Sequence, residues 1–256
     1  MIDFPPVVAG DAVKVSASTY LAFRQCPAQA QARYQRVYSA ESKASFTGAL
    51  AHRLFARHLQ TGPIENLHQA VREEIGVGLN HKMVSLGLRR PSELEEVVRQ
   101  VGALYDRFRR FPSDGFEAAE VELEVEPTDG VTLHGKIDAV YREGLAGPVL
   151  RDWKTGGLGE PLDQLMFYAL VWALGHGELA GMVEAVSLQT GERVSRVPTR
   201  TMMKSVAQSV AELVNAMRRA WSSQTEVERR GGPWCRYCPL LSNCPEGQTV
   251  DALTHR

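Results

Sequence analysis

Two stretches in the middle of the chain, HGKIDAV at residues 134–140 and VLRDWKTG at residues 149–156, carry the strongest pattern in the sequence. We expect both to lie in β-strands. Successive residues of a strand point to opposite faces of a sheet, so Asp152 and Lys154 project together. Asp138 lies on the neighbouring strand. The sequence therefore predicts two carboxylates and one amine on the same side of a sheet.

Around these stretches the apolar pattern changes from a helical period to a strand period after Pro112. Residues 119–126 alternate apolar and acidic side chains, which predicts a strand with one solvated face. Within its own strand, Asp138 is expected on the face opposite Ile137 and Ala139. The expected strands are 119–126, 131–141, 148–155, 183–188 and 193–198.

Helices are expected before, between and after these strands. The first begins with Ser16 or Ser18 as its N-cap and runs past Cys26. The third begins with a capping box formed by Ser92 and Glu95. The expected helices cover about 15–34, 46–59, 92–108, 162–174 and 204–221, and residues 60–90 carry no clear pattern. This order predicts an α/β fold with a mixed central β-sheet flanked by helices.

Composition restricts the class of protein. The chain has 256 residues, of which 44% are hydrophobic and 23% are charged. This is typical of one large globular domain and excludes disorder over most of the length. No apolar run approaches the ~20 residues that span a bilayer, and the N-terminus has no signal-peptide pattern. We therefore expect a cytoplasmic protein without a membrane segment.

Charge is unevenly distributed, although the net charge is only −1. Residues 112–130 include seven acidic and no basic residues. Residues 14–43 include five basic and one acidic residue, and residues 200–236 include seven basic and three acidic residues. Two basic ends of this kind favour contact with a polyanion. The alternative is that arginines such as Arg218 and Arg219 are ordinary solvated helix faces.

The pair of carboxylates predicts a site for a hard divalent cation, because Mg²⁺ and Mn²⁺ prefer oxygen ligands. Such a cation lowers the pKa of bound water and stabilises charge that develops on a phosphate. A lysine beside it orients the attacking water and offsets phosphate charge. An isolated Asp-x-Lys tripeptide is more often an ion pair without a metal, so this pattern alone leaves both interpretations open.

Four motifs in order resemble one nuclease family. They are GALAH at 48–52, GKID at 135–138, DWK at 152–154 and QLMFY at 164–168. This set resembles the RecB-like branch of the PD-(D/E)xK nuclease superfamily. The resemblance implies a restriction-endonuclease-like core that cleaves DNA.

The resemblance also implies roles for individual residues. Asp138 and Asp152 would bind the metal, and Lys154 would serve the attacking water. His52 would be a further metal ligand, which favours Mn²⁺ over Mg²⁺. Without the resemblance, the favoured interpretation of His52 is a histidine that packs on a helix face. Gln164 would face the active site and the DNA. So would Tyr168, for which ordinary helix packing is the alternative, whereas Glu122 and Glu124 are expected to be solvated.

The four cysteines form a second pattern. Cys235, Cys238 and Cys244 are close in sequence, and Cys26 lies far upstream. Clustered thiols in a reducing compartment suggest a metal, and this spacing by itself permits either Zn²⁺ or an iron–sulfur cluster. The arrangement resembles the 4Fe–4S lobe of the CRISPR-associated RecB-like nucleases and of the AddB nuclease domain. That resemblance implies a 4Fe–4S cluster on these four cysteines.

We therefore expect a single RecB-like domain over residues 1–256, with a core at about 46–221 and a lobe formed by about 14–45 and 222–250. The expected activity is metal-dependent cleavage of single-stranded DNA or duplex ends, with exonuclease action implied by the family. Possible protein partners belong to recombination or CRISPR adaptation. Two alternatives stay open: a catalytically silent DNA-binding or assembly subunit of the same fold, and a zinc-stapled interaction protein.

Overall fold

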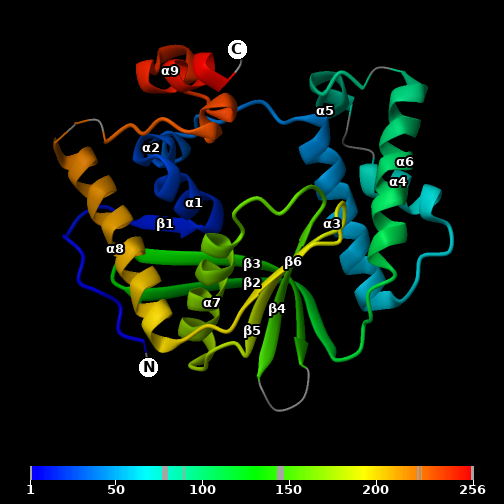
Figure 1. Cartoon of the computed structure of the whole chain (residues 1–256), viewed down its shortest axis with the longest axis horizontal. Coiled ribbons are helices and arrows are strands. Elements are labelled where there is room, and N and C mark those ends of the chain that lie inside the picture. Colours follow the sequence, from blue (N-terminus) through cyan, green and yellow to red (C-terminus); the bar gives the residue numbers. More distant parts are fainter. Residues whose placement is uncertain are drawn as a thin grey trace.

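The computed structural model describes residues 2–76, 80–88, 90–142, 147–223, 225 and 227–254 (Figure 1). Its strands are β1 Val13–Ser16, β2 Phe116–Thr128, β3 Val131–Arg142, β4 Pro148–Lys154, β5 Met182–Ser187 and β6 Arg193–Arg196. Its α-helices are α1 Ala17–Gln25, α2 Pro27–Tyr34, α3 Lys43–Thr61, α4 Leu67–Ile75, α5 Asn80–Ser85, α6 Pro91–Phe108, α7 Leu162–His176, α8 Arg200–Ser223 and α9 Pro245–Thr254. Two 3₁₀ helices, η1 Pro233–Tyr237 and η2 Leu241–Asn243, precede α9.

The strands form one mixed sheet in the order β1-β3-β4-β5-β6, and β2 also pairs with β3. The β1–β3 and β4–β5 pairs are parallel, whereas the other pairs are antiparallel. Along one edge of β3, β1 pairs with residues 131–134 and β4 pairs with residues 139–142. These two partners leave residues 135–138 between them, and Asp138 is the last residue of this gap. The predicted α/β fold with a mixed sheet flanked by helices is confirmed.

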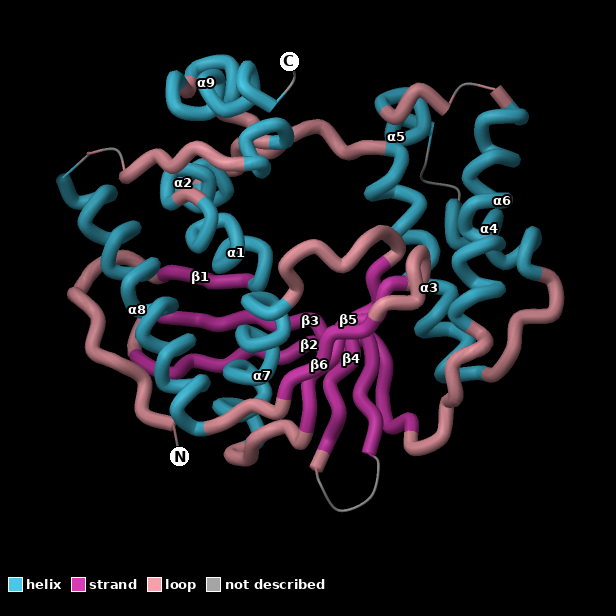
Figure 2. Tube along the Cα trace, in the orientation of Figure 1, coloured by secondary structure: helices cyan, strands magenta, loops and turns pink. Residues whose placement is uncertain are grey.

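Helices cover the sheet in two groups (Figures 1 and 2). Helices α1, α7 and α8 share a buried apolar cluster with β1, β3 and part of β5. Helices α3, α4 and α6 form a second cluster, into which Trp153 of β4 and Val186 of β5 insert. Trp153 therefore anchors the end of β4 on the α3 side, while its neighbours Asp152 and Lys154 point to the α7 side.

The first expected helix is wrong in two respects. Its first residues form strand β1, and the helix starts only at Ala17, with Ser16 as its N-cap. It also ends at Gln25, because Pro27 disfavours a helical conformation for the residue before it. Cys26 accordingly has extended backbone angles (φ −156°, ψ 112°), and Pro27 starts the new helix α2. This break turns Cys26 out of both helices.

The start of α6 also differs from the expectation. The helix begins at Pro91 with Arg90 as its N-cap, and the Glu93 carboxylate accepts a hydrogen bond from the Arg90 amide (2.9 Å). Proline fits the first helical position because it has no amide hydrogen to satisfy there. Ser92 and Glu95 therefore do not form the cap. Helices α4, α5 and α9 were not anticipated from the sequence.

One detail of β3 corrects the expected alternation. Ile137 belongs to the apolar cluster with α7, whereas Ala139 packs with Tyr141 and Val149 in a third cluster. The expectation that Ile137 and Ala139 share one face is therefore wrong. Across from this point, Glu120 of β2 has a positive φ of 54°, a conformation rare for non-glycine residues. The regular pleat is thus interrupted on both strands beside Asp138.

Among the described residues, each helix is too short or too polar to cross a membrane.

Candidate active site

Three acidic residues lie in one row across adjacent strands. The β3–β4 ladder ends at the pair Ala139 and Arg151, and the next position along it places Asp152 beside Asp138. On the other side of β3, Glu120 lies between the paired residues Ala119 and Val121, which places it opposite Asp138. The strands therefore bring together carboxylates that are 14 to 18 residues apart in sequence. Asp138 and Asp152 are brought together as predicted, whereas Glu120 was not anticipated.

Asp138 is held by both of its carboxylate oxygens. Its Oδ2 accepts a hydrogen bond from the backbone amide of Trp153 (2.7 Å), at the point where the β3–β4 ladder has ended. Its Oδ1 lies 3.1 Å from Nδ1 of His52 on α3. A side chain thus replaces the missing ladder bond, which satisfies a buried amide and fixes the orientation of the carboxylate.

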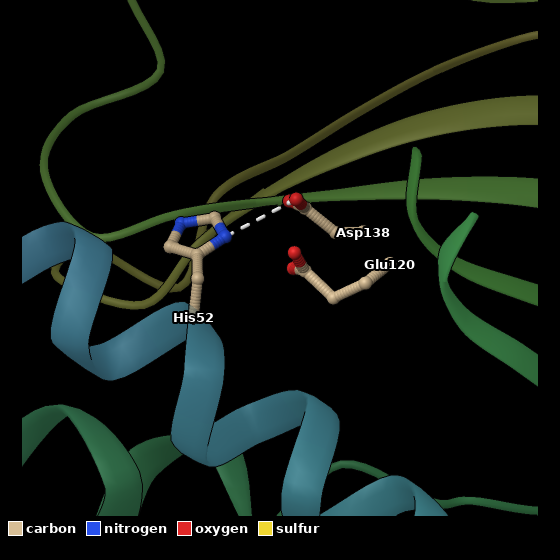
Figure 3. A group of neighbouring side chains, drawn as sticks. All are labelled: His52, Glu120 and Asp138. Atoms are coloured by element: carbon tan, nitrogen blue, oxygen red, sulfur yellow. Dashed lines mark ion pairs between the residues drawn. The ribbon is translucent and has the colours of Figure 1, made fainter. Parts of the chain in front are cut away.

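His52, Glu120 and Asp138 form a group whose donor atoms all lie within 4.8 Å of one another (Figure 3). Figure 3 shows the His52 ring and both carboxylates directed toward a common point between α3 and the sheet. The three side chains are partly buried, and the Glu120 side chain also forms an ion pair with Lys136. One nitrogen and two carboxylates are ligands that Mn²⁺ and Mg²⁺ accept, so the donor set fits a divalent cation.

Glu120 is the site residue that the sequence interpretation missed. The acidic residues of β2 considered from the sequence were Glu122 and Glu124, which continue the alternation of β2. Glu122 is exposed (62% for its side chain), and Glu124 pairs with Lys14 at the surface. The available signal was the register: Glu120 is the acidic residue of β2 that faces Asp138 once the hairpin at residues 127–130 closes.

A second group surrounds Asp152 on the α7 side of β4. Lys154 Nζ lies 2.8 Å from Oδ2 of Asp152 and donates a hydrogen bond to Oε1 of Gln164 (2.5 Å). The Gln164 amide donates to Oδ1 of Asp152 (3.2 Å) and to the Tyr168 hydroxyl (2.7 Å). Gln164 therefore connects the carboxylate, the lysine and the tyrosine in one network, and the predicted residues of α7 and β4 meet.

Burial and neighbouring charges shift the pKa values of Asp152 and His52. Burial raises the pKa of Asp152 to about 6, with the nearby Asp138 charge adding to the effect and the Lys154 ammonium opposing it. Burial alone would lower the pKa of His52, but the Asp138 carboxylate outweighs it, so the pKa of His52 is raised. Two neighbouring carboxylates, Asp138 and Asp152, repel each other when both are charged, which favours binding of a cation in place of the protons.

Two glycines of the sequence motifs allow the helices to approach the site. A Cβ atom on Gly48 of α3 would lie 3.0 Å from the Thr155 hydroxyl, directly after β4. A Cβ atom on Gly135 of β3 would lie 3.3 Å from Val171 of α7. Both contacts are tighter than ordinary van der Waals packing, so glycine permits His52 and Gln164 to reach the strand residues.

The four cysteines gather at one end of the molecule, although Cys26 is about 200 residues from the others. Burial raises the pKa of the Cys238 thiol, and Cys26, Cys235 and Cys244 lie close enough to raise it further. All four thiols are free. The Arg230 amide donates to the sulfur of Cys26 (3.3 Å), and the Gly232 amide donates to that of Cys235 (3.4 Å). Four thiols with amide donors match the ligand chemistry of an iron–sulfur cluster or of zinc.

Comparison with known proteins supports the family and little else. A search of curated proteins gives no match. One similar solved structure, titled "Crystal structure of SSO0001", is 13% identical, with 93% of this chain and 88% of that chain covered. Its TM-score of 0.39 is too low for us to draw a conclusion from it.

The family model is more informative. The model described as "PD-(D/E)XK nuclease superfamily" matches residues 14–245, which include strands β2 to β6, all but the first residue of β1, and all four cysteines. The match spans the mixed sheet and the row of carboxylates described above. Membership in this superfamily implies metal-dependent nuclease activity. The chain therefore belongs to the PD-(D/E)XK nuclease superfamily.

Proposed function

We propose that this protein is a metal-dependent DNA nuclease of the RecB-like type that hydrolyses phosphodiester bonds as an exonuclease on single-stranded DNA or duplex ends. The observation that supports it most is the row of Glu120, Asp138 and Asp152, in a chain that belongs to a nuclease superfamily. His52 lies against Asp138 and Glu120, and Lys154 lies against Asp152.

His52, Asp138 and Asp152 are the metal ligands that the resemblance predicts, and Glu120 offers a further carboxylate. A divalent cation held there would supply Lewis-acid polarisation of the phosphate and the attacking water. The protein prepares the ligands in advance: the Trp153 amide holds one oxygen of Asp138 and leaves the other directed at His52. Little rearrangement is then needed when the substrate arrives.

Lys154 is placed to act on the water and on the phosphate. Its ammonium is held between Asp152 and the Gln164 carbonyl oxygen, so its position is determined by two contacts. We propose that it orients the attacking water and offsets negative charge on the phosphate during hydrolysis. Gln164, held in turn by the Tyr168 hydroxyl, keeps the lysine in place.

For the cysteine lobe we propose a 4Fe–4S cluster on Cys26, Cys235, Cys238 and Cys244. The free thiols and the two amide donors fit a cluster or zinc, and the resemblance to RecB-like nucleases with a 4Fe–4S lobe favours iron–sulfur over zinc. The cluster would join the two ends of the chain. Its role is structural, and we assign it no electron transfer during cleavage.

Digestion of end-labelled DNA tests the activity. Single strands and duplexes labelled at either the 5′ or the 3′ end are incubated with Mn²⁺, Mg²⁺ or EDTA. We expect cleavage with Mn²⁺ and with Mg²⁺, none with EDTA, and none by an Asp152→Asn variant. Progressive loss of the label from one end would establish exonuclease action and its polarity, whereas internal fragments would contradict it.

The same samples separate the alternatives. A protein that binds DNA without cutting it in any metal is the silent DNA-binding or assembly subunit. A protein with one zinc ion per chain and no DNA binding is the interaction protein. A brown protein with iron, active on DNA, supports the proposal as a whole. Its place in recombination, repair, phage DNA metabolism or CRISPR adaptation, its protein partners in these processes, and its cytoplasmic location are parts of the proposal.

A further inference from the structure

Most exposed arginines of α3 and α6 are neutralised by neighbouring carboxylates. Arg53, Arg57 and Arg99, for example, pair with Glu74, Glu73 and Glu96. Arg107 near the end of α6, Arg110 just after it and Arg193 at the start of β6 differ from these. They are exposed, and no described residue forms an ion pair with them. We call these three residues the arginine rim.

The rim is held together by specific contacts. Arg107 Nη1 donates hydrogen bonds to the backbone carbonyls of Leu188 and Gln189 (3.1 and 3.2 Å), which binds α6 to the turn between β5 and β6. The guanidinium of Arg193, directly after this turn, lies over the Phe111 ring at 5.0 Å. Arg110 is the chain neighbour of Phe111. In Figure 1 this turn reaches toward α3 and α6.

The rim lies next to the proposed active site. The Phe111 ring that carries Arg193 packs against the Trp153 ring at 5.1 Å, and the Trp153 amide holds Asp138. The Leu188 amide also donates to the carbonyl of Lys154 (2.8 Å), so the turn held by Arg107 is bonded directly to the catalytic strand. The rim therefore lies close enough to Asp138 to contact a DNA strand that is cut there, because each nucleotide extends a strand by ~3.4 Å.

The basic ends of the chain, which the sequence suggested for contact with a polyanion, are available only in part. Arg218 is buried and donates to the carbonyls of Val8, Asp11 and Gly130. Arg24 pairs with Asp163 at the surface. Folding thus uses some of the charges of the basic ends. Others there, such as Arg36 and Arg219, are exposed and form no ion pair with a described residue. The rim differs from them because its contacts join it to the segments that carry Trp153 and Lys154.

We propose that the arginine rim binds the phosphate backbone of the DNA strand that enters the active site. This inference rests on the proposed function for the identity of the ligand. Unneutralised guanidinium groups bind phosphate with two parallel hydrogen bonds and carry no base specificity. Arg107 is the positioning residue of the rim, and Arg110 and Arg193 are the phosphate contacts.

The test measures binding without cleavage. A fluorescein-labelled single strand of 30 nucleotides is titrated in EDTA, and its anisotropy is followed at several salt concentrations. An Arg110→Ala/Arg193→Ala variant should bind roughly tenfold more weakly at about 50 mM salt. The slope of log K against log [salt] should fall by about 1.4, because each contact to a single strand contributes ~0.7. The Arg110→Lys/Arg193→Lys variant should recover most of the affinity.

The control is an Arg57→Ala/Arg99→Ala variant, which removes the same charge from arginines that are already paired. It should keep the affinity and the slope of the wild type. Equal losses of affinity in both variants would show that only net charge matters, which would overturn the rim proposal. An unchanged salt slope in the rim variant, or a wild-type protein that does not bind the strand, would also overturn it.

If the rim variant loses affinity but the wild type never cuts DNA with Mn²⁺, the rim stands and the nuclease proposal fails. If the wild type cuts and the rim variant binds normally, the nuclease proposal stands and the rim fails.

Discussion

The acidic site lies on three paired strands, whereas the cysteine lobe is made of 3₁₀ turns, helix α9 and the segment around Cys26. In the site, the β2–β3 and β3–β4 ladders set the positions of the carboxylates before any cation binds. In the lobe, the buried residue of η1 is Cys235 itself, and η2 has no buried residue. The lobe thus has little apolar core to hold its four sulfurs in place.

Hydrogen bonds between distant segments join the two halves of the lobe. The Ala28 amide donates to Glu228, the Arg230 amide donates to Cys26, and the Ser39 hydroxyl donates to the Tyr237 carbonyl. A few such bonds contribute about 1 kcal/mol each, far less than a metal cluster does. Strand β1, at residues 13–16, pairs with β3 in the central sheet, although the predicted lobe begins at about residue 14. The boundary of the lobe therefore stays a prediction. The comparison teaches that substitutions in the site should change chemistry, and substitutions in the lobe should change stability.

The largest expected effect is on cleavage by the carboxylate variants. Asp138→Asn and Asp152→Asn should each lower the rate by ~10³-fold or more, because they remove charge that holds the metal. DNA binding in EDTA should change little, since phosphate contacts lie elsewhere. End-labelled DNA digestion measures the rate, and thermal unfolding measures the stability.

Asp138→Ala sharpens this test. Asparagine keeps an oxygen for the Trp153 amide, whereas alanine leaves that amide unpaired at a cost of about 1–3 kcal/mol. The alanine variant should therefore unfold at a lower temperature than the asparagine variant, with equal loss of cleavage. Normal cutting by either Asp138 or Asp152 variant would end the assignment of the site.

The second effect concerns the lobe. Cys26→Ala and Cys235→Ala should both lose iron and colour, because both thiolates are proposed to bind one cluster. Losing the link between the chain ends should cost roughly 5 kcal/mol, the scale expected for closing a loop of this length. Protease should then cut near the termini first and leave the strand core longer. Metal analysis and limited proteolysis measure these changes.

A Cys26→Ala protein with full iron and full stability would contradict the proposed lobe. Cys26 would then be a buried free thiol beside a three-cysteine arrangement. Zinc in place of iron in the wild type would keep the structural comparison but change the metal.

Lys154→Met is expected to reduce cleavage by about 10²-fold or more, with the metal still bound, because the ammonium acts on the water and the phosphate. Lys14→Met is the matched control, since Lys14 pairs with Glu124 at the surface. Misfolding of the Lys154 variant alone would show that Lys154 is a structural partner of Asp152.

Glu120 is tested by metal affinity and not by rate alone. Glu120→Gln should weaken Mn²⁺ binding by roughly tenfold, measured by calorimetry on the protein without DNA, because one of three clustered donors loses its charge. Glu122→Gln removes a neighbouring charge that is also near Lys136 but outside the cluster. Equal Mn²⁺ affinity in the two variants would show that Glu120 does not bind the metal.

The smallest effect is a shift in stability with pH. The pKa of Asp152 is raised from its ordinary value of 3.8 to about 6, so its contribution to stability is present below pH 4 and is lost as the pH rises through 6. The raised pKa of His52 acts in the same direction. A cation that replaces these protons should therefore raise the unfolding temperature by about 3 °C at pH 8 and by almost nothing at pH 5. An equal rise at both values would show that Mn²⁺ binds elsewhere.

Prediction from the sequence succeeded where the pattern is local. The alternation of β2 from Val121 to Glu126, the facing pair Asp152 and Lys154, and the one-turn spacing of Gln164 and Tyr168 follow from fixed periods of strand and helix. These periods hold where the element is regular, whereas the interruption of the pleat beside Asp138 was not predicted. The break of the first helix at Pro27 was also a local signal, and it was overlooked.

The sequence by itself determined that Asp152 and Lys154 share a strand face, and that three cysteines lie together near the end of the chain. Only the tertiary structure decided that Glu120 faces Asp138, that Cys26 joins the other cysteines, and which arginines stay unneutralised. The physical reason is that spacing along one element is set by backbone geometry, whereas neighbours across elements depend on strand register and on which surfaces are buried together. Those depend on the whole chain.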